Sequence, residues 1–375
     1  MPALASSSTA DVVVIGGGIV GAATAAHLAS AGRRVTLIEA TAIGAGASGR
    51  NSGVVQHPFD PVLVDLHLET VELYRSLEGF ELPAIPVGLL NVTHDVDGAH
   101  RLASSLAATH PRLRPEFLAP DDVRRLEPAV GRDVAACRLD IGFPVGPASA
   151  TAAYAAWTER LGVDIRIGSS ASVQWQRHRA TGVQFADGSA VAAHDVVVAA
   201  GPWTPAIVDP SGSWRPIRPI WGVVATVDLP TPPRHVMEEA DIAIEPGNEL
   251  DDAGHSFSLV TALGATSLGS TFLADAPDVA ATVPRLVERG SQFVPAIATS
   301  RIGAVRMCAR PQSLDGRPLI GAVGGVDGLW VAAGHGPWGI STGPASGRMV
   351  ADLITGAVAA PPAALDPARF GSIGS

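Results

Sequence analysis

Lysine is absent from this sequence of 375 residues, and all 26 basic residues are therefore arginine. The absence excludes every mechanism that needs a lysine side chain. Cysteine is almost as rare, since the chain contains only Cys137 and Cys308. Two cysteines cannot form a disulfide framework, and their scarcity favours a cytoplasmic protein in a reducing environment.

Positive charge is also scarce, because the formal net charge at pH 7 is −10. Binding of nucleic-acid phosphates needs a basic surface, so this balance argues against a nucleic-acid partner. Hydrophobic residues make up 47% of the chain and charged residues 17%, which is typical of a compact folded protein. The length predicts two domains. No cluster of metal-ligating residues appears, and we expect no metal.

One long stretch without formal charge, residues 12–32, could span a bilayer by its length of 21 residues. Three consecutive glycines, Gly16 to Gly18, would weaken a single helix there by about 1 kcal/mol each. The flanking residues bring no aromatic belt, and the first nine residues lack the basic start of a secretory signal. We therefore expect a buried strand and helix, and no integral membrane segment.

Residues 11–40 have the pattern of a strand, a glycine turn, a helix and a second strand. Gly16, Gly18 and Gly21 occupy the glycine positions of GxGxxG. The first permits the turn, the second lets the backbone approach a pyrophosphate, and the third lets helix and strand pack closely. Glu39 ends the second strand, where its carboxylate can accept hydrogen bonds from ribose hydroxyls and repels a 2′-phosphate. We expect dinucleotide binding through Gly16, Gly18, Ile19, Val20, Gly21, Glu39 and Ala40.

Similar elements recur in the middle and at the end of the chain. Helices are predicted over 62–77, 148–161 and 345–354, strands over 86–92, 195–200 and 328–333, and a hairpin turn at 187–188. Alternating segments at 217–227 and 257–272 predict antiparallel strands. The expected fold class is α/β, or α+β overall. A Rossmann-type domain takes residues 9–84, 144–214 and 318–370, and a β-rich antiparallel domain with helices takes 85–143 and 215–317.

Four stretches follow one another along the chain: the GxGxxG unit through Glu39, GASGRNSGVV at 46–55, DVVVAAGPWTP at 195–205, and the sequence from Arg310 to residue 354. In this order they resemble the D-amino acid oxidase superfamily of flavoenzymes, in particular its glycine oxidase, D-amino acid dehydrogenase and sarcosine oxidase branch. The first stretch is shared by many nucleotide-binding proteins, whereas the four together are much more specific. The resemblance implies FAD as the dinucleotide.

Two of these stretches are expected to add cofactor contacts. Small residues in 48–53 allow close approach, and the Ser and Asn side chains can donate hydrogen bonds; an ordinary loop is the alternative. The resemblance places this segment beside the flavin ring and the backbone near Val173 at the adenine, where plain sheet core is the alternative. The expected cofactor residues are Ser48, Arg50, Asn51, Ser52, Gly53, Val173, Ala200, Gly201 and Trp203.

The segment from Gly334 to Ile340 lies between a predicted strand and a predicted helix. Its glycines leave backbone N–H groups accessible, and the helix dipole directs positive charge at the turn, where a reduced flavin carries negative charge. A tight structural turn could have the same sequence. We expect cofactor contacts from Gly334, Gly336, Pro337, Trp338, Gly339 and Ile340. His335 is either a packed histidine or, by the resemblance, a catalytic residue beside the flavin.

Arg310 occupies the position at which similar glycine oxidases have the arginine that binds the substrate carboxylate. A guanidinium can hold a carboxylate through two hydrogen bonds. The alternative is a surface arginine or a partner of Asp315. Cys308 precedes Asp315 by seven residues, as does the flavin-linked cysteine of sarcosine oxidase-like enzymes, but Arg310-Pro311 departs from that branch. We therefore expect non-covalent FAD, with a covalent link through Cys308 as the less favoured alternative.

Two departures affect the chemistry that the resemblance implies. Sarcosine oxidase-type enzymes promote oxygen reduction with a lysine, which this chain lacks, so we expect a slow oxidase or a dehydrogenase. Only Tyr74 and Tyr154 exist, both on predicted helices, so the substrate-binding tyrosines of several relatives are missing. His255 and Trp221 are expected on strands that face the flavin, with packed core residues as the alternative, and His255 is a candidate catalytic residue.

The sequence therefore predicts an FAD-dependent oxidoreductase that acts on a small amine bearing a carboxylate. Arg310 holds the carboxylate, the neutral amine gives up a hydride from Cα to flavin N5, and the resulting imine hydrolyses, which requires no acid–base residue. The electron acceptor is O2 or an unidentified partner. Oxidation of a 2-hydroxy acid, a non-catalytic flavin-binding subunit of a larger complex, and an NAD-dependent dehydrogenase are the alternatives.

Overall fold

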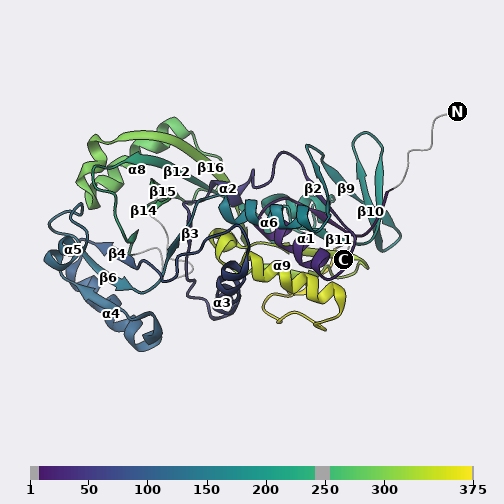
Figure 1. Ribbon diagram of the computed structural model, residues 1–375, viewed down its shortest axis with the longest axis horizontal. Helices are drawn as coiled ribbons and strands as arrows, with labels where there is room; N and C mark the ends of the chain where they lie inside the picture. The colour runs from purple at the N-terminus through teal and green to yellow at the C-terminus, as the bar shows by residue number, and fades with distance from the viewer. Residues whose placement is uncertain (1–7, 241–253, 374–375) are drawn as a thin grey trace.

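The computed structural model describes residues 8–240 and 254–373, which fold around two large β-sheets (Figure 1). Strand β1 (Ser8–Ile15) lies inside the first sheet, and Val12 to Val14 are at most 1% exposed. Such a strand, buried on both faces, is typical of a parallel sheet covered by helices. The sheet has the order β17 (Leu319–Ala322), β18 (Leu329–Ala333), β11 (Ala190–Val198), β1, β2 (Val35–Glu39) and β8 (Asp164–Ile167). Only β17 is antiparallel to its neighbour in this row.

Helices cover one face of this sheet and begin at one edge of it. They are α1 (Ile19–Ser30), α3 (Pro61–Ser76), α6 (Ser149–Arg160) and α9 (Gly339–Thr355). Small residues let α1 and α9 cross closely, because a Cβ on Gly347 would lie 2.7 Å from the Thr24 nitrogen. Since α1 follows β1 and α9 follows the parallel strand β18, both helices start at the carboxyl edge of the sheet. A hairpin of β9 (Ala171–Gln176) and β10 (Arg179–Phe185) extends from β11, and α7 (Thr204–Val208) packs on the opposite face.

The second sheet is built mainly from antiparallel strands. Its order is β16 (Arg301–Ser313), β12 (Ile217–Asp228), β15 (Ala265–Thr271), β14 (His255–Ala262), β13 (Val236–Glu239), β4 (Leu89–Thr93), β6 (Ala135–Leu139) and β5 (Glu116–Leu118). Only β13 and β4 run parallel. A small ribbon of β3 (Val54–Val55) and β7 (Phe143–Pro144) lies apart from both sheets. The remaining short elements are α2 (Ala47–Arg50), α5 (Pro120–Leu126), and 3-10 turns at Pro111–Leu113, Gly201–Trp203, Pro295–Thr299, Gly336–Trp338 and Pro367–Phe370.

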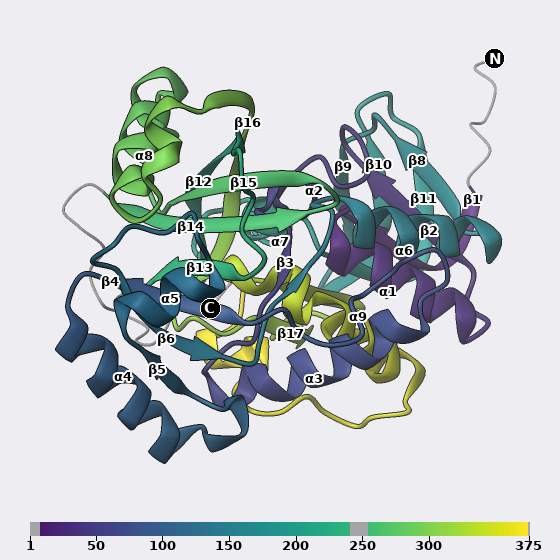
Figure 2. The ribbon, with the colours of Figure 1, turned by 60° about the vertical axis from the view of Figure 1, so that its left-hand side comes forward.

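The two faces of the second sheet have different coverings. Helix α8 (Val279–Phe293) packs on one face (Figure 2). Phe257 of the sheet stacks there on Phe293 of the helix, with ring centres 4.8 Å apart. Helix α4 (Val96–Thr109) covers the β4 and β6 end of the other face. The β12 to β16 end of that face is left to line a cavity that the first sheet also borders. The fold therefore sets the carboxyl edge of a parallel sheet against a broad antiparallel wall.

The α/β fold class is confirmed, with the expected division into parallel and antiparallel sheets. The first sheet draws its strands from residues 8–39, 164–198 and 319–333, and the second draws them from 89–139 and 217–313. The predicted domain bounds remain a prediction. Residues 12–32 form β1, the glycine turn and α1, and no helix in the described ranges has the length and apolar character to cross a membrane.

Two local predictions were wrong. The segment between the second strand and residue 53, which we expected to be a loop of small residues from residue 43 onward, contains the short helix α2, and the last helix starts at Gly339 instead of residue 345. The second error arose because Pro344 lies inside α9, where proline cannot donate a backbone hydrogen bond and normally ends a helix. Here the Thr70 hydroxyl of α3 accepts from the Ala345 nitrogen at 3.2 Å, which supports the interrupted turn.

Candidate active site

A cavity of about 1020 Å³ lies between the two sheets. Residues after β1, β2, β11 and β18 line one side of it, and residues of β12 to β16 line the other. Pockets for drug-sized ligands span about 300–1,000 Å³, so this one has room for a dinucleotide together with a small substrate.

The glycine turn after β1 borders the cavity on the side of the first sheet. Gly16 has φ +114°, and a Cβ on it would lie 2.4 Å from the Ala199 carbonyl oxygen, so only glycine fits. A Cβ on Gly21 would lie 1.9 Å from the Gly16 oxygen, which explains the third glycine as a packing position. Gly18 borders the cavity itself. Gly16 and Gly18 therefore line the cavity, whereas Gly21 packs behind the turn.

The side chains of Glu39 and Ser48 hydrogen-bond to the backbone of the glycine turn. Glu39 Oε2 accepts a hydrogen bond from the Gly17 nitrogen at 2.7 Å, and its Oε1 accepts one from the Thr41 nitrogen at 2.9 Å. Ser48 Oγ accepts from the Ile19 nitrogen at 3.0 Å at the start of α1. Oε1 also accepts from the Thr41 hydroxyl at 3.1 Å, whereas Oε2 has a second lone pair with which Glu39 can still accept from a ribose hydroxyl at the cavity wall.

A second helix N-terminus borders the cavity where α9 begins. Residues 335 to 341 all line the cavity, and the first turn of α9 carries neither an acidic residue nor a side-chain cap. The Tyr74 hydroxyl donates to the Ile340 carbonyl at 2.7 Å, and Ser341 Oγ accepts from the Gln56 nitrogen at 2.8 Å. Helix α3 and the segment after β3 thereby fix this turn, and its positive dipole end is directed at the cavity.

His335 belongs to the framework behind this turn. It is 2% exposed, and its Nε2 lies 2.9 Å from Ser346 Oγ inside α9. The Ser346 hydroxyl donates to the Thr342 carbonyl, so the imidazole is the donor to Ser346. Burial lowers the pKa of His335 to about 3, which keeps the ring neutral. The structure thus places His335 as a packed residue that orients the turn.

Arg310 extends from β16 over the antiparallel wall. Its guanidinium donates to the Thr271 carbonyl and to Ser270 Oγ, each at 2.6 Å, and it lies 4.5 Å from the centre of the Phe272 ring. A Cβ on Gly222 would lie only 2.4 Å from Nη2, so the guanidinium rests directly over that glycine. Desolvation lowers the pKa of Arg310, yet no carboxylate of the described residues pairs with it.

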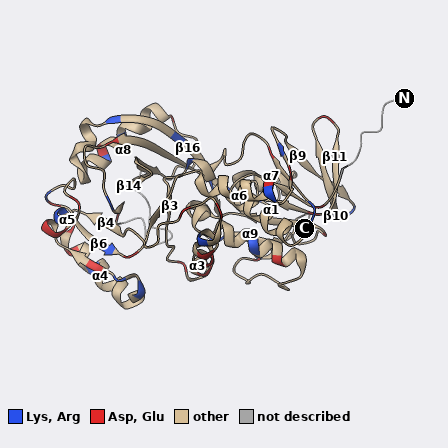
Figure 3. Ribbon diagram, viewed as in Figure 1, with Lys and Arg blue, Asp and Glu red and all other residues tan. Residues whose placement is uncertain are grey.

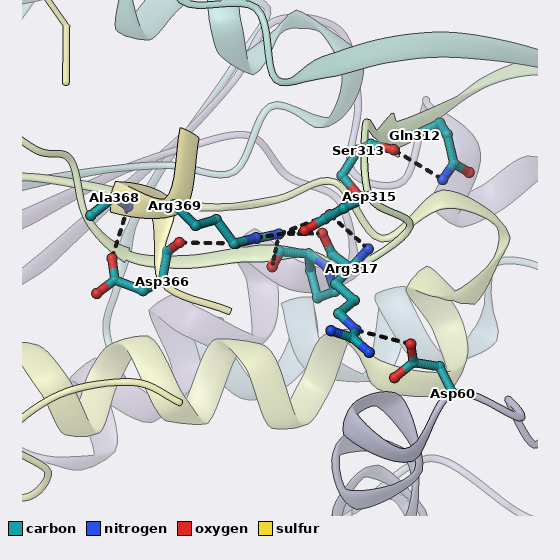
Figure 4. A network of polar contacts seen from close by, with 9 residues as sticks. Asp60, Gln312, Ser313, Asp315, Arg317, Asp366, Ala368 and Arg369 are labelled. Atoms are coloured by element: carbon teal, nitrogen blue, oxygen red, sulfur yellow. Dashed lines mark hydrogen bonds and ion pairs between the residues drawn. The ribbon is translucent and has the colours of Figure 1, made fainter. Parts of the chain in front are cut away.

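Asp315, the alternative partner of Arg310, is engaged elsewhere (Figure 4). Its two carboxylate oxygens accept from Arg369 at 2.7 and 3.1 Å, and it also accepts from the Arg317 nitrogen at 3.1 Å. Arg317 in turn reaches Asp60 at 2.9 Å. This network joins the β16–β17 connection to α3 and the C-terminal segment, and it leaves Arg310 facing the cavity.

Most of the predicted site residues line this one cavity. They are Gly16, Gly18, Ile19, Val20, Glu39, Ala40, Ser48, Arg50, Asn51, Ser52, Ala200, Gly201, Trp203, Arg310, His335, Gly336, Pro337, Trp338, Gly339 and Ile340. Trp221 and Cys308 line it as well. Burial raises the pKa of the Cys308 thiol, which disfavours the thiolate that a covalent link would need.

Five predicted residues lie outside the cavity lining, and each has a structural reason. Gly21 and Gly334 are packing glycines, Gly53 turns the chain at φ +90°, and His255 is buried at the start of β14. Val173 is core of the first sheet, and Ser169 to Ala171 line the cavity in its place. The register of β9 decides which residue faces inward, and the sequence offered no side-chain signal for it.

The sequence analysis also missed several polar residues of the cavity. Glu238 on β13, Gln56 after β3, and Ser256, Ser258 and Ser270 on the antiparallel wall all line it. Burial raises the pKa of Glu238 to about 7. Glu238 is one of two adjacent glutamates, and β13 is only four residues long, so no periodic pattern indicated which one faces the cavity.

Charged side chains are otherwise dispersed over both parts of the fold (Figure 3). Arg50 and Arg310 are the arginines among the described lining residues, and Glu39 and Glu238 are the acids. The cavity therefore has one acid at the dinucleotide end and one at the antiparallel wall.

The cavity is bordered by a glycine turn with Glu39 beside it, a second helix N-terminus, and Arg310, which has no carboxylate partner among the described residues. This combination fits a dinucleotide-dependent oxidoreductase. The comparison with protein families specifies which one. Residues 11–353 match the DAO family of FAD-dependent oxidoreductases, and the chain belongs to this family.

Individual relatives cover nearly the whole chain. The glycine oxidase of Geobacillus kaustophilus is 29% identical over 92% of this chain and 92% of its own length. The D-amino acid dehydrogenase of Xanthobacter autotrophicus is 26% identical over 92% of this chain and 95% of its own. The crystal structure of the L-proline dehydrogenase of P. horikoshii has the same fold, with a TM-score of 0.81 and 21% identity over 97% of this chain and 98% of that chain.

The residues present fit FAD, the cofactor of this family. A Cβ on Gly18 would meet only the Ser48 hydroxyl, at 3.0 Å, so the glycine keeps the approach to the start of α1 open for a pyrophosphate. The start of α9 offers a second uncapped dipole end for the flavin ring. When bound, FAD supplies the two-electron acceptor, while the protein supplies orientation and electrostatics.

Proposed function

We propose that the chain oxidises a small amino acid or secondary amine whose carboxylate binds Arg310. One observation carries this proposal. Arg310 is a desolvated cation in the cavity, held by Ser270 and Thr271, and no carboxylate of the described residues neutralises it. A substrate carboxylate would neutralise the Arg310 guanidinium, because an unpaired buried charge is costly and a guanidinium binds carboxylates through two hydrogen bonds.

The antiparallel wall and the start of α9 would then hold the substrate between them. Arg310 and the hydroxyls of the wall would orient the carboxylate, and bound FAD would supply the acceptor for the hydride from Cα. The imine that remains hydrolyses in water. Met307 and Trp221 add apolar surface to the lining, and they favour a substrate with a small or apolar side chain.

An anaerobic reduction screen of the FAD-loaded protein tests this function. The panel contains glycine, N-methylglycine, D-alanine and L-proline as amines, and glycolate and D-lactate as hydroxy acids. We expect at least one amine to bleach the flavin at a rate that saturates with concentration, and the hydroxy acids to leave it oxidised. Reduction by hydroxy acids alone would favour 2-hydroxy-acid oxidation, and reduction by none would favour a flavin-binding subunit.

A further inference from the structure

Glu238 stands on the same face of the antiparallel wall as the groups that hold Arg310. It pairs with Ser258 on β14, and Ser258 pairs with Gly269 on β15, beside Ser270. Directly paired residues of neighbouring strands project to one face of a sheet, which places Glu238 and Ser258 on the cavity face, and Ser270, the residue after Gly269, lines the cavity as well. The wall therefore presents a cation near β15 and a carboxyl group two strands away.

The strands that carry these two groups are separated by a distance on the scale of a small zwitterion. Neighbouring strands lie about 4.8 Å apart, so the Glu238 backbone stands about 10 Å from β15, where Ser270 and Thr271 hold the guanidinium. Two charge-assisted hydrogen bonds of about 2.8 Å each, together with the few bonds that separate carboxylate from amine, cover a span of this order. The spacing of the strands is therefore compatible with one amino acid that extends from Arg310 toward Glu238.

Neither group is neutralised by a residue that the structure describes. Among the described residues, no arginine or histidine forms an ion pair with Glu238, and no acid forms one with Arg310. Burial raises the pKa of Glu238, and a hydrogen-bonding interaction with the Gln56 amide, which is 6% exposed, lowers it in part. The Glu238 carboxyl group therefore has a neutral polar neighbour but no cation to pair with among the described residues, which leaves it open to a ligand with an amino group.

We propose that Glu238 binds the amino group of the substrate and takes up the proton that the ammonium loses before hydride transfer. This inference rests on the proposed function. In the step, one N–H bond of the ammonium breaks and an O–H bond forms on Glu238. The products are a neutral amine and a neutral carboxylic acid, and no electrons leave the pair. The amine nitrogen then keeps its lone pair to stabilise the cation that forms as Cα loses the hydride.

The surroundings of Glu238 suit this exchange. Asn91 on β4 and Ser258 on β14 are its cross-strand neighbours, and neither carries a charge. The nearest titratable group along this row is the Cys137 thiol on β6, and burial raises its pKa to about 11, so it stays neutral. Arg50 and Arg310 are the arginines of the lining. Glu238 is thus the one group of this end of the described cavity whose proton can come and go near neutral pH.

The test compares anaerobic reduction of the FAD-loaded protein in Glu238→Gln and wild type, with the amine that reduces wild type fastest. We expect the limiting rate at pH 7 to fall by about 10²-fold, the lower range for loss of a general base. The wild-type rate should rise with pH through an inflection near 7. In E238Q this inflection should vanish, and the rate should follow the free-amine fraction of the substrate to higher pH. Glu238→Asp should retain an inflection.

Glu239→Gln is the matched control, because it removes the neighbouring carboxylate, which pairs with Arg289 and is absent from the lining. It should keep the wild-type inflection. Acetate, which has a carboxylate but no amine, should perturb the flavin spectrum of E238Q and wild type at the same concentrations. If E238Q does not fold, Glu238→Met carries the same expectations.

The outcomes separate two kinds of failure. A wild type that is reduced by an amine, with an E238Q variant of equal rate and unchanged inflection, overturns the role of Glu238 and leaves the proposed function intact. Loss of acetate binding in E238Q also overturns it, because the defect would then be general. A wild type that no amine reduces overturns the proposed function and this inference together.

Discussion

Gly222→Ala is the most informative single change at the proposed carboxylate site, because it displaces Arg310 without removing it. The new methyl group would lie 2.4 to 2.6 Å from three atoms of the guanidinium, and the backbone of Gly222 has no left-handed conformation to strain. The guanidinium ends a flexible side chain, so it can move aside at little cost to folding. In moving it loses its hydrogen bonds to Ser270 and Thr271.

The expected loss of affinity for the substrate carboxylate follows from the strength of such hydrogen bonds. A hydrogen bond to a charged group contributes about 1.5–3 kcal/mol. If the displaced guanidinium loses one such hydrogen bond to the substrate carboxylate, the affinity for the carboxylate falls by about 10- to 150-fold, at about 1.4 kcal/mol per tenfold. We expect the loss in KM, and in the dissociation constant of acetate, because the cofactor contacts are untouched.

Gly303→Ala is the matched control. It adds the same methyl group to β16, where the nearest atom of another residue is Thr226 Cβ at 3.5 Å, an ordinary contact. The assay is spectral titration of the bound flavin with acetate, together with thermal unfolding of both variants. Acetate binding by G222A at the wild-type concentration would refute the placement of Arg310 as the carboxylate ligand.

Further predictions concern the framework and the cofactor. Tyr74→Phe removes the hydrogen bond to the Ile340 carbonyl and should lower the free energy of unfolding by about 1–3 kcal/mol in denaturant titration. Burial lowers the pKa of His335 to about 3 and that of His67 to about 4 in the folded protein. As the pH falls below 6.5, both histidines therefore become protonated in the unfolded state while they stay neutral in the folded state. Stability should therefore fall toward acid pH by up to about 1.4 kcal/mol per pH unit for each histidine, and His335→Gln should reduce this slope; an unchanged slope would contradict the assignment. Acid precipitation should release all flavin into the supernatant, whereas a yellow pellet would indicate a covalent link through Cys308. Because the chain has no lysine, the reduced flavin should react slowly with air in stopped flow, and rapid reoxidation would count against this expectation.

The dinucleotide half of the site was the part most open to prediction from the sequence. Its function depends on backbone geometry, and backbone geometry of this kind needs glycine at set spacings. Gly16 illustrates this, since only glycine tolerates both φ +114° and the approach of the Ala199 oxygen. Glu39 followed from its place at the end of the second strand. Short motifs with such steric causes can be identified without knowledge of the rest of the fold.

The antiparallel wall was harder to predict, because its chemistry arises from pairing between distant strands. Glu238 meets Ser258 only through the register of β13 and β14, which the sequence does not encode in a local pattern. Val173 shows the same difficulty in the first sheet, where the cavity meets the residues just before it. The His335 ring turns back to Ser346, which agrees with the packed histidine of the two alternatives, and a catalytic role beside the flavin stays a prediction. Side-chain direction within a turn depends on packing against α9.

We propose above that Arg310 holds the carboxylate of an amine substrate beside the bound FAD. Arg310→Met tests it most directly, since methionine keeps much of the side-chain volume and removes the charge. We predict that anaerobic reduction by the best amine of the panel will need at least about 100-fold more substrate, in line with loss of two charge-assisted hydrogen bonds. The FAD content should stay at the wild-type level. A variant that is reduced at the same substrate concentration as wild type would contradict the account.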